Sequence, residues 1–356
     1  MVVATSQILV AATVLVMPVA SYKFLAIGDW GASYESDDCG GSPSVQQQQD
    51  AVAMGNYASS NNVSFTMLLG DNFYSSGVHG DCHNCRFEKT FEDIYNATAL
   101  QSMPFYAIAG NHDHLGNVSA QIEYSQVSKR WIYPDWYYTF EKSFEDDGEN
   151  VTMQFIMIDT VLLDVLDGNS KYGMMSDAPG SPLPEGAPSK KEQLTWLESE
   201  MSRSTADYLW VAGHYPVWSG CEHGNTLELH VDLKPLLEKY HATGYMSGHD
   251  HCEEYIDDGT GPVYLITGSG FECCYSNKNA GQLPKGATKF AYWNGDCPAG
   301  ATCPTKSPNS AFTAFTVTKE SLVMDIIDSA GKTLFTTDPV KPRSPVQKGS
   351  IDVSQA

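Results

Sequence analysis

The sequence predicts an α/β protein in which two sheets are each backed by helices. Short apolar runs typical of buried strands alternate with helical patterns up to about residue 250, and mostly strand-like runs follow. The chain has 356 residues and 42% hydrophobic composition, which is ample for a large core. Its polar motifs extend from Asp29 to His251. We therefore expect most of the chain to close around one site as a single domain.

The expected strands are runs of apolar, β-branched and aromatic residues. They lie at residues 22–28, 65–70, 105–109, 153–159, 208–212, 244–247, 263–267, 312–318 and 322–327. Helical patterns lie between them, at residues 46–59, 119–129, 192–201 and 231–240. In the first of these helices, we expect Val45, Val52 and Ala53 to face the core.

The chain ends and two long connections carry patterns of their own. Residues 8–20 form an apolar run too short to span a bilayer, and it resembles a secretory signal peptide, assigned to residues 1–21. The alternative is a first buried strand. Residues 22–337 then form the domain, and the proline-rich residues 338–356 are predicted to be a disordered tail. The polar connections 160–190 and 271–310 are long enough to be functional, and the first is a candidate lid.

Charge and cysteine content indicate the class of protein and its compartment. The net charge of -22 argues against nucleic-acid binding, because no surplus of Lys or Arg is present to neutralise phosphates. Nine cysteines and four Asn-X-Ser/Thr sequons favour a secreted glycoprotein with disulfide bonds. Vacuole and lysosome also fit, and we expect a monomer without stable membrane insertion after signal cleavage. Because nine is odd, at least one cysteine must be free or paired with another chain, and Cys221 and Cys252 are the candidates.

Five short blocks place polar residues directly after predicted strands, where α/β folds build their sites. They hold two carboxylates, an amide oxygen, three imidazoles and a phenol. This set contains too much oxygen for a structural zinc site and suits two metal ions of unlike hardness that share a bridging carboxylate. The blocks are Gly28-Asp29-Trp30-Gly31, Gly70-Asp71-Asn72-Phe73-Tyr74, Gly110-Asn111-His112-Asp113, Val211-Ala212-Gly213-His214 and Gly248-His249-Asp250-His251.

Tyr74 distinguishes this ligand set from that of most two-metal phosphoesterases. Their first block reads Asp-X-His, whereas Gly31 occupies the histidine position here, which leaves one metal a ligand short. Tyr74, three residues after Asp71, can supply a phenolate instead. A phenolate is a hard anion that favours a trivalent ion, Fe(III) above all.

The five blocks, together with the run from Gly110 to Gln121, resemble the purple acid phosphatases, most of all their small, single-domain, tartrate-resistant type. The similarity extends from about Tyr22 to about Phe335. It implies the four-layer αββα metallophosphoesterase fold, a two-sheet β-sandwich flanked by helices on both sides. It also implies roles for nine side chains: Asp29, Tyr74 and His251 on Fe(III), Asp71 as the bridge, Asn111, His214 and His249 on a divalent ion, and His112 and His223 as catalytic groups that contact phosphate.

These assignments predict a secreted binuclear metal acid phosphatase that hydrolyses phosphate monoesters by attack of a metal-bound hydroxide. Fe(II), Zn(II) and Mn(II) suit the second metal position about equally well. Three alternatives stay open at this point. They are a related metallophosphoesterase acting on diesters or phosphoproteins, an iron-dependent redox protein, and a secreted glycoprotein that binds phosphate or mineral without turnover.

Overall fold

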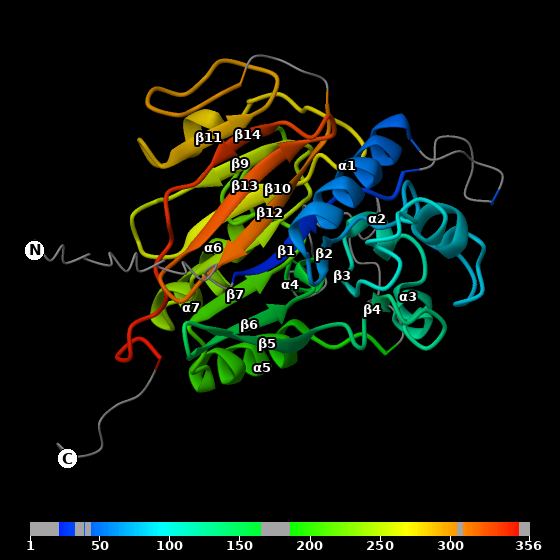
Figure 1. The fold of residues 1–356 in the computed structure, drawn as a ribbon, viewed down its shortest axis with the longest axis horizontal. Helices are drawn as coiled ribbons and strands as arrows, with labels where there is room; N and C mark the ends of the chain where they lie inside the picture. The colour runs from blue at the N-terminus through cyan, green and yellow to red at the C-terminus, as the bar shows by residue number, and fades with distance from the viewer. Residues whose placement is uncertain (1–20, 33–38, 40–43, 165–185, 305–308, 349–356) are drawn as a thin grey trace, which may run out of the picture.

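The computed structural model describes residues 21–32, 39, 44–164, 186–304 and 309–348. Two seven-stranded sheets pack face to face, with helices outside them (Figure 1), so the predicted two-sheet αββα sandwich is confirmed. The predicted signal peptide lies outside the described residues except for its last residue, and so does most of the candidate lid, residues 165–185.

The first sheet brings the strands before three of the five blocks side by side. β1 lies parallel to β2, β2 to β3 and β3 to β4, whereas β12 runs antiparallel to β1. The carboxyl ends of β1, β2 and β3 therefore share one edge. In spatial order the strands are β14 (Thr333–Thr336), β13 (Leu322–Asp328), β12 (Ala311–Val317), β1 (Tyr22–Ile27), β2 (Thr66–Leu69), β3 (Phe105–Ile108) and β4 (Trp131–Ile132).

The second sheet carries the strands before the other two blocks. β6, β7, β8 and β10 are parallel to one another in that order, so the ends of β7 and β8 also share an edge. In spatial order the strands are β11 (Thr288–Tyr292), β9 (Glu253–Ile256), β10 (Val263–Thr267), β8 (Gly244–Ser247), β7 (Tyr208–Ala212), β6 (Glu149–Met157) and β5 (Tyr138–Asp146). The strands β4, β5, β9, β11 and β14 were not predicted from the sequence.

Aromatic rings fill the space between the two sheets. Phe24 of β1 stacks on Phe315 of β12 with ring centroids 4.2 Å apart, and it meets the edge of Phe155 of β6 at 5.2 Å. Trp210 of β7 reaches across to Phe315 at 5.7 Å. These side chains bury large areas, and their offset and edge-to-face contacts favour a rigid core. The two ligand-bearing edges are thereby held in a fixed relation.

The helices cover the outer faces and differ from the prediction in detail. Val45 and Val52 are exposed, because α1 packs through Ala51, Met54 and Ala58 on another face. The expected helix at 231–240 is two helices that meet at Leu233. The helices are α1 (Val45–Asn61), α2 (Asn111–His114), α3 (Val118–Tyr124), α4 (Thr160–Leu163), α5 (Lys190–Arg203), α6 (Leu227–Asp232), α7 (Lys234–Lys239), the π-helix η1 (Phe87–Glu92) and the 3-10 helix η2 (Ala280–Gln282). None of the described helices is long and apolar enough to cross a membrane.

The predicted disordered tail is wrong for residues 338–348. Val340 pairs with Leu322 of β13, and the buried Arg343 side chain donates hydrogen bonds to the carbonyl oxygens of Ser204 and Ala206. These carbonyls follow α5 and need donors once buried. A tertiary contact thus orders a segment that has no periodicity of its own. Residues 349–356 lie outside the described part of the chain.

The expected free thiols at Cys221 and Cys252 are also wrong, because these two cysteines form a disulfide bond with each other. They lie on neighbouring loops, with Cα atoms 6.9 Å apart, although 31 positions separate them in sequence. The unpaired cysteine is Cys82. The other disulfide bonds join Cys39 to Cys85, Cys273 to Cys274 and Cys297 to Cys303.

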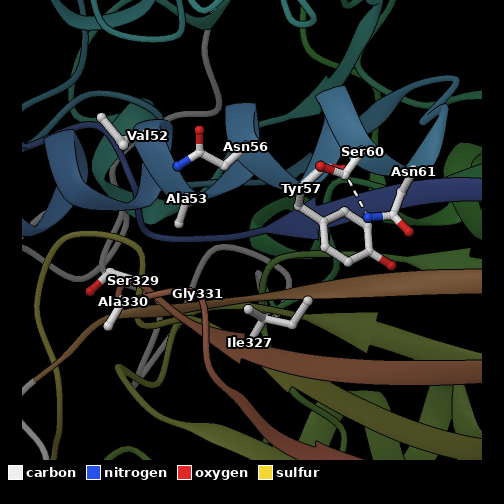
Figure 2. A pocket seen from close by; sticks show the side chains of 10 residues that line it. All are labelled: Val52, Ala53, Asn56, Tyr57, Ser60, Asn61, Ile327, Ser329, Ala330 and Gly331. Carbon is white, nitrogen blue, oxygen red and sulfur yellow. Dashed lines mark hydrogen bonds between the residues drawn. The ribbon is translucent and has the colours of Figure 1, made fainter.

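A surface groove of about 430 Å³ lies between α1 and the end of β13 (Figure 2). Tyr57 and Asn61 from the helix, and Ile327 and Gly331 from the strand and its following turn, contribute to its walls. A second hollow of about 540 Å³ lies between α5 and the α6–α7 pair. Neither contains a predicted metal ligand.

Asp164 at the end of α4 and Glu228 of α6 form a carboxyl pair that predicts a pH dependence of stability. Burial, followed by the hydrogen bond and charge of Glu228, raises the pKa of Asp164 to about 8. Because an unfolded aspartate titrates near 3.9, this contribution to stability is complete below pH ~4 and is lost as pH rises through about 8. We expect the Asp164→Asn variant to lose less thermal stability than the parent between pH ~5 and ~8. Calorimetry at several pH values measures this change of thermal stability with pH. The exposed Asp296→Asn variant is the control and should show the same pH dependence as the parent. The same pH dependence in Asp164→Asn as in the parent would contradict the prediction.

Candidate metal centre

The predicted ligands stand at adjoining edges of the two sheets. Asp29 and Asp71 follow β1 and β2, while His214 and His249 follow β7 and β8. The Gly248 amide donates to the His214 carbonyl oxygen, and the Asp29 amide donates to the carbonyl oxygen of Gly70. Asp29, Asp71 and His249 adopt left-handed backbone angles, with φ of 55°, 50° and 71°. Such angles are uncommon outside glycine and concentrate at functional sites.

One half of the cluster gathers around the Tyr74 hydroxyl. Its Oη lies 2.8 Å from Asp29 Oδ1, 2.8 Å from Asp71 Oδ2 and 3.1 Å from His251 Nε2. His251 Nε2 is also 3.5 Å from Asp29 Oδ1. Three protein donors of the predicted trivalent site and the predicted bridge therefore converge on one point.

The other half gathers around His214. Its Nε2 lies 3.1 Å from Asn111 Oδ1 and 3.4 Å from Asp71 Oδ2, and its ring centroid is 5.2 Å from that of His249. The same carboxylate oxygen of Asp71 thus faces Tyr74 on one side and His214 on the other. This is the position that a bridging ligand needs.

Hydrogen bonds to the backbone orient these side chains. His214 Nδ1 donates to the carbonyl oxygen of Leu69 at 2.8 Å, which directs Nε2 at the cluster. The amides of His112 and His249 donate to Asp71 Oδ1 and Asp29 Oδ2, at 2.9 and 2.7 Å. Each carboxylate is thereby held by one oxygen and presents the other to the cluster.

The two predicted catalytic histidines lie on opposite halves. The His112 ring packs on Tyr74 with centroids 4.5 Å apart, and its Nδ1 donates to the Ser75 carbonyl oxygen at 2.5 Å. The His223 ring stacks on His249 at 4.3 Å. His112 is partly exposed and His223 is exposed, so both can meet a ligand that arrives from solvent.

The calcineurin-like phosphoesterase family matches residues 22–253. Tartrate-resistant acid phosphatase type 5 of Rattus norvegicus is 37% identical over 92% of this chain and 93% of its own length. The Homo sapiens protein of the same name is 36% identical over 88% and 90%. Purple acid phosphatase 17 of Arabidopsis thaliana is 31% identical over 76% and 75%. The chain belongs to the purple acid phosphatases, within the calcineurin-like phosphoesterases.

This phosphoesterase therefore has the family and the enzyme class that its sequence predicts, since these relatives are named acid phosphatases, which are phosphoric monoester hydrolases. Among solved structures, the Plasmodium protein described as GAP50, the anchor in the inner membrane complex, superposes with a TM-score of 0.71. It covers 91% of this chain and 90% of its own at 21% identity, and so it supports the fold alone.

The side chains of this phosphoesterase fit a binuclear metal centre. Asp29, Asp71 and His214 are buried and present ligand atoms within 4.8 Å of one another. Burial, and then the charges of Asp29 and Asp71, raises the pKa of the Tyr74 phenol well above its usual value. Two buried carboxylates around a phenol need a cation, and a cation would reverse the shift of that phenol.

Imidazolium protons supply part of that positive charge when metal is absent. Burial would lower the pKa of His214, but the Asp71 carboxylate raises it to about 10. Burial would likewise lower the pKa of His251, but Asp29 and Glu272 raise it to about 9. Metal ions would replace these protons, as expected where neutral imidazole and ionised carboxylate share a ligand set.

Sequence reasoning missed three side chains from the connection at 271–310. The Tyr275 ring stacks on His251 with centroids 4.2 Å apart, and Phe271 packs on Tyr74 at 4.4 Å. Glu272 Oε2 lies 3.6 Å from His251 Nδ1. These residues follow no strand-end motif. The length and polarity of the connection at 271–310 indicated a functional segment, but neither property predicted that the segment lies beside His251.

Proposed function

We propose that this protein is a secreted binuclear metal acid phosphatase that hydrolyses phosphate monoesters. The single observation that carries the proposal is the position of Asp71. One of its carboxylate oxygens faces Tyr74 at 2.8 Å and His214 at 3.4 Å, so that it can serve two metal positions at once. Similarity to acid phosphatases over most of the chain supports the same activity.

The ligand set divides by hardness. Asp29, Tyr74 and His251 would hold Fe(III), and Asn111, His214 and His249 would hold Fe(II), Zn(II) or Mn(II). When bound, the two ions would neutralise the phosphate charge and acidify a water molecule to a nucleophile. Burial would raise the pKa of Asp71, but the charge of His214 holds it well below its usual range, so the ionised carboxylate would join the two positions. No side chain of the protein needs to carry the phosphoryl group.

The two histidines would act on the substrate directly. His112 Nδ1 is engaged by the Ser75 carbonyl oxygen, so its Nε2 can donate a proton to the leaving oxygen. His223, held against His249, would contact the phosphate from the other half of the site. Positioned general acids of this kind contribute typically ~10²–10⁴-fold.

Replacing His112 with Ala tests its acid role. We expect kcat for an alkyl phosphate, a poor leaving group, to fall ~10²–10⁴-fold, and that for p-nitrophenyl phosphate to fall far less, since a good leaving group needs little protonation. Steady-state kinetics in metal-replete protein measures both. His79→Ala, an exposed histidine on the loop after Tyr74, serves as the control. Equal losses for the two substrates would assign His112 to binding instead.

Comparing monoester with diester turnover at acidic pH tests the substrate class itself. Preferential diester hydrolysis would favour a related metallophosphoesterase that acts on diesters and would contradict the proposal of a monoester phosphatase.

The processing and location of the chain belong to the same proposal. Residues 1–21 would be removed as a signal peptide, residues 22–337 would form the catalytic domain, with residues 338–348 packed on it, and the monomeric product would be secreted or held in a vacuole or lysosome. The Cys221–Cys252 and Cys297–Cys303 disulfide bonds support an oxidising compartment. Determining the N-terminal residue of the protein secreted by a eukaryotic host tests this; retention of Met1 would contradict it.

A further inference from the structure

His223 lies on a loop whose backbone is bonded to a segment far from it in sequence. The loop runs between β7 and α6, and the side chains of Glu222 and His223 are exposed. The loop is tied to the segment that carries the ligands His249 and His251. The His223 amide donates to Asp250 Oδ1 at 2.8 Å, and the Gly224 amide donates to Asp250 Oδ2 at 3.2 Å. Asp250 lies between the two ligands, so it couples the backbone of His223 to the centre.

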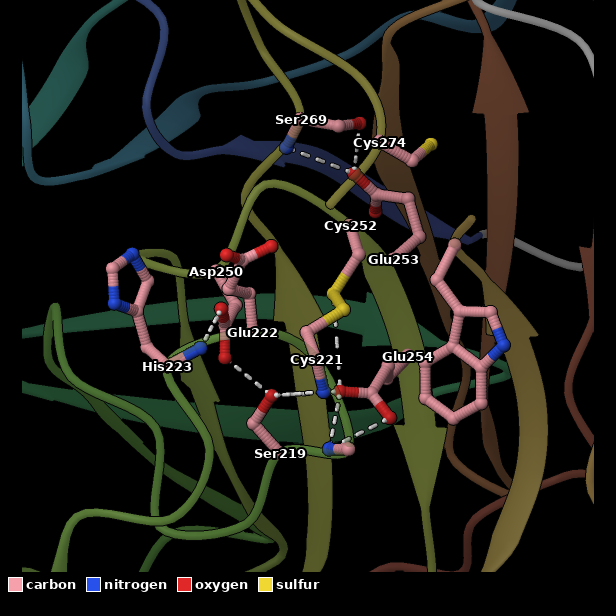
Figure 3. The surroundings of a disulfide bond; sticks show 12 residues. Ser219, Cys221, Glu222, His223, Asp250, Cys252, Glu253, Glu254, Ser269 and Cys274 are labelled. Atoms are coloured by element: carbon pink, nitrogen blue, oxygen red, sulfur yellow. Dashed lines mark hydrogen bonds between the residues drawn. A yellow bond between two sulfur atoms is a disulfide. The ribbon is translucent and has the colours of Figure 1, made fainter. Parts of the chain in front are cut away.

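The Cys221–Cys252 disulfide bond joins the same two segments covalently. Cys221 lies two residues before His223, and Cys252 follows His251 directly. Both cysteines are fully buried. Figure 3 shows the bond between Asp250 on one side and Glu254 on the other, with His223 projecting from the loop it anchors.

A buried polar network lies against this disulfide bond. Ser219 Oγ lies 2.5 Å from Asp250 Oδ2 and 3.0 Å from Glu254 Oε2, and it accepts the Cys221 amide at 3.0 Å. The Glu254 carboxyl group also accepts the Gly220 amide, at 3.0 Å. Ser219, Asp250 and Glu254 are each 0% exposed. Because the bonds to Asp250 and Glu254 cross between the loop and the chain around the ligand segment, the network resists displacement of one relative to the other.

The connection at 271–310 also holds the loop. Asn279 Nδ2 donates to the carbonyl oxygens of Cys221 and Glu222, at 2.7 and 2.9 Å, and the backbone amide of Asn279 donates to the carbonyl oxygen of Gly220. The Tyr275 ring lies 5.6 Å from the His223 ring. The backbone of residues 219–224 is therefore held from both sides, while the imidazole stays open to solvent.

We infer that the Cys221–Cys252 disulfide bond and the Ser219–Asp250–Glu254 network form one positioning unit that holds His223 over the divalent half of the metal centre. The inference rests on the role proposed for His223. Neither cysteine is a metal ligand in that proposal. The unit acts by keeping the imidazole stacked on His249, and a displacement of about 1 Å can cost ~10²-fold in rate at such a site.

The test compares the Cys221→Ala/Cys252→Ala double variant with the parent protein, both loaded with metal. We expect unchanged metal content and a kcat that falls ~10–100-fold, the range for residues that orient a catalytic group. Adding His223→Ala to the double variant should give no further loss, because the two changes remove the same function. The Cys297→Ala/Cys303→Ala variant also lacks one disulfide bond, but one that does not join these two segments, and it should keep parental activity.

Hydrogen exchange provides a readout that does not depend on activity. In the double variant, we expect the amides of residues 219–226 to exchange at least ~10-fold faster, because the bonds from His223 and Gly224 to Asp250 open. The Ser219→Ala variant keeps the disulfide bond and should show the same acceleration to a smaller degree, which covers the case that the double variant folds poorly.

Unchanged exchange over residues 219–226, or losses of activity that multiply independently with His223→Ala, would overturn the inference. If exchange accelerates as expected but the parent protein hydrolyses no phosphate monoester, the proposed function fails while the positioning unit stands.

Discussion

The Asp71→Asn variant is expected to lose at least ~10³-fold in kcat/KM for phosphate monoesters. Asp71 Oδ2 lies near both Tyr74 and His214, so its replacement weakens both halves of the site. A bound metal supplies several kcal/mol of transition-state stabilisation, and each 1.36 kcal/mol corresponds to a factor of ten in rate. Kinetics together with metal analysis of the purified variant measures the effect.

Asn is the appropriate replacement because it keeps the shape of the side chain and tolerates the φ of 50° at this position. Asp147→Asn is a matched control, since Asp147 also has a left-handed φ, of 54°, and is exposed in the turn between β5 and β6. Parental activity in a metal-replete Asp71→Asn protein would show that no bridging ligand is needed there.

The Tyr74→Phe variant of the iron-loaded, oxidised protein is expected to lack the visible absorption band of the parent. A phenolate bound to Fe(III) produces such a band by charge transfer, and Tyr74 Oη is the phenol oxygen at the convergence of Asp29, Asp71 and His251. Phenylalanine retains the ring that packs on Phe271 and removes only the oxygen. The absorption spectrum of both proteins is the measurement.

Tyr275→Phe separates ligation from proximity. The Tyr275 ring stacks on His251, so its hydroxyl is nearby without belonging to the predicted ligand set, and its loss should leave the band unchanged. A band that persists in Tyr74→Phe, or is missing from the iron-replete parent, would contradict the Tyr74 assignment. The diester-type metallophosphoesterase reading would then be favoured.

The site edge was predictable because it depends on local pattern. An apolar run followed by Asp, Asn or His describes a strand that ends at the surface of the core, and parallel strands bring such ends together. Asp29, Asp71 and His214 therefore meet as expected. Tyr74 follows Asp71 by three residues, and that spacing already placed its hydroxyl near the same carboxylate.

Contacts between distant segments followed no such rule. Glu272 and Tyr275 reach His251 from a connection without periodicity, and Cys221 meets Cys252 only because β7 and β8 are neighbours in the sheet.

The patterns at residues 45–52 and 338–348 misled for a related reason. Val45 and Val52 are apolar but exposed, because smaller residues of α1 make the closer contact with the sheet. Arg343 is charged but buried, because carbonyl groups beyond α5 need its donors. Local patterns thus predicted nine of the fourteen described strands, the order of the candidate ligands and the chemistry proposed for them. Packing between segments far apart in sequence decided which loops lie beside these side chains, since those contacts form only when folding brings the distant segments together.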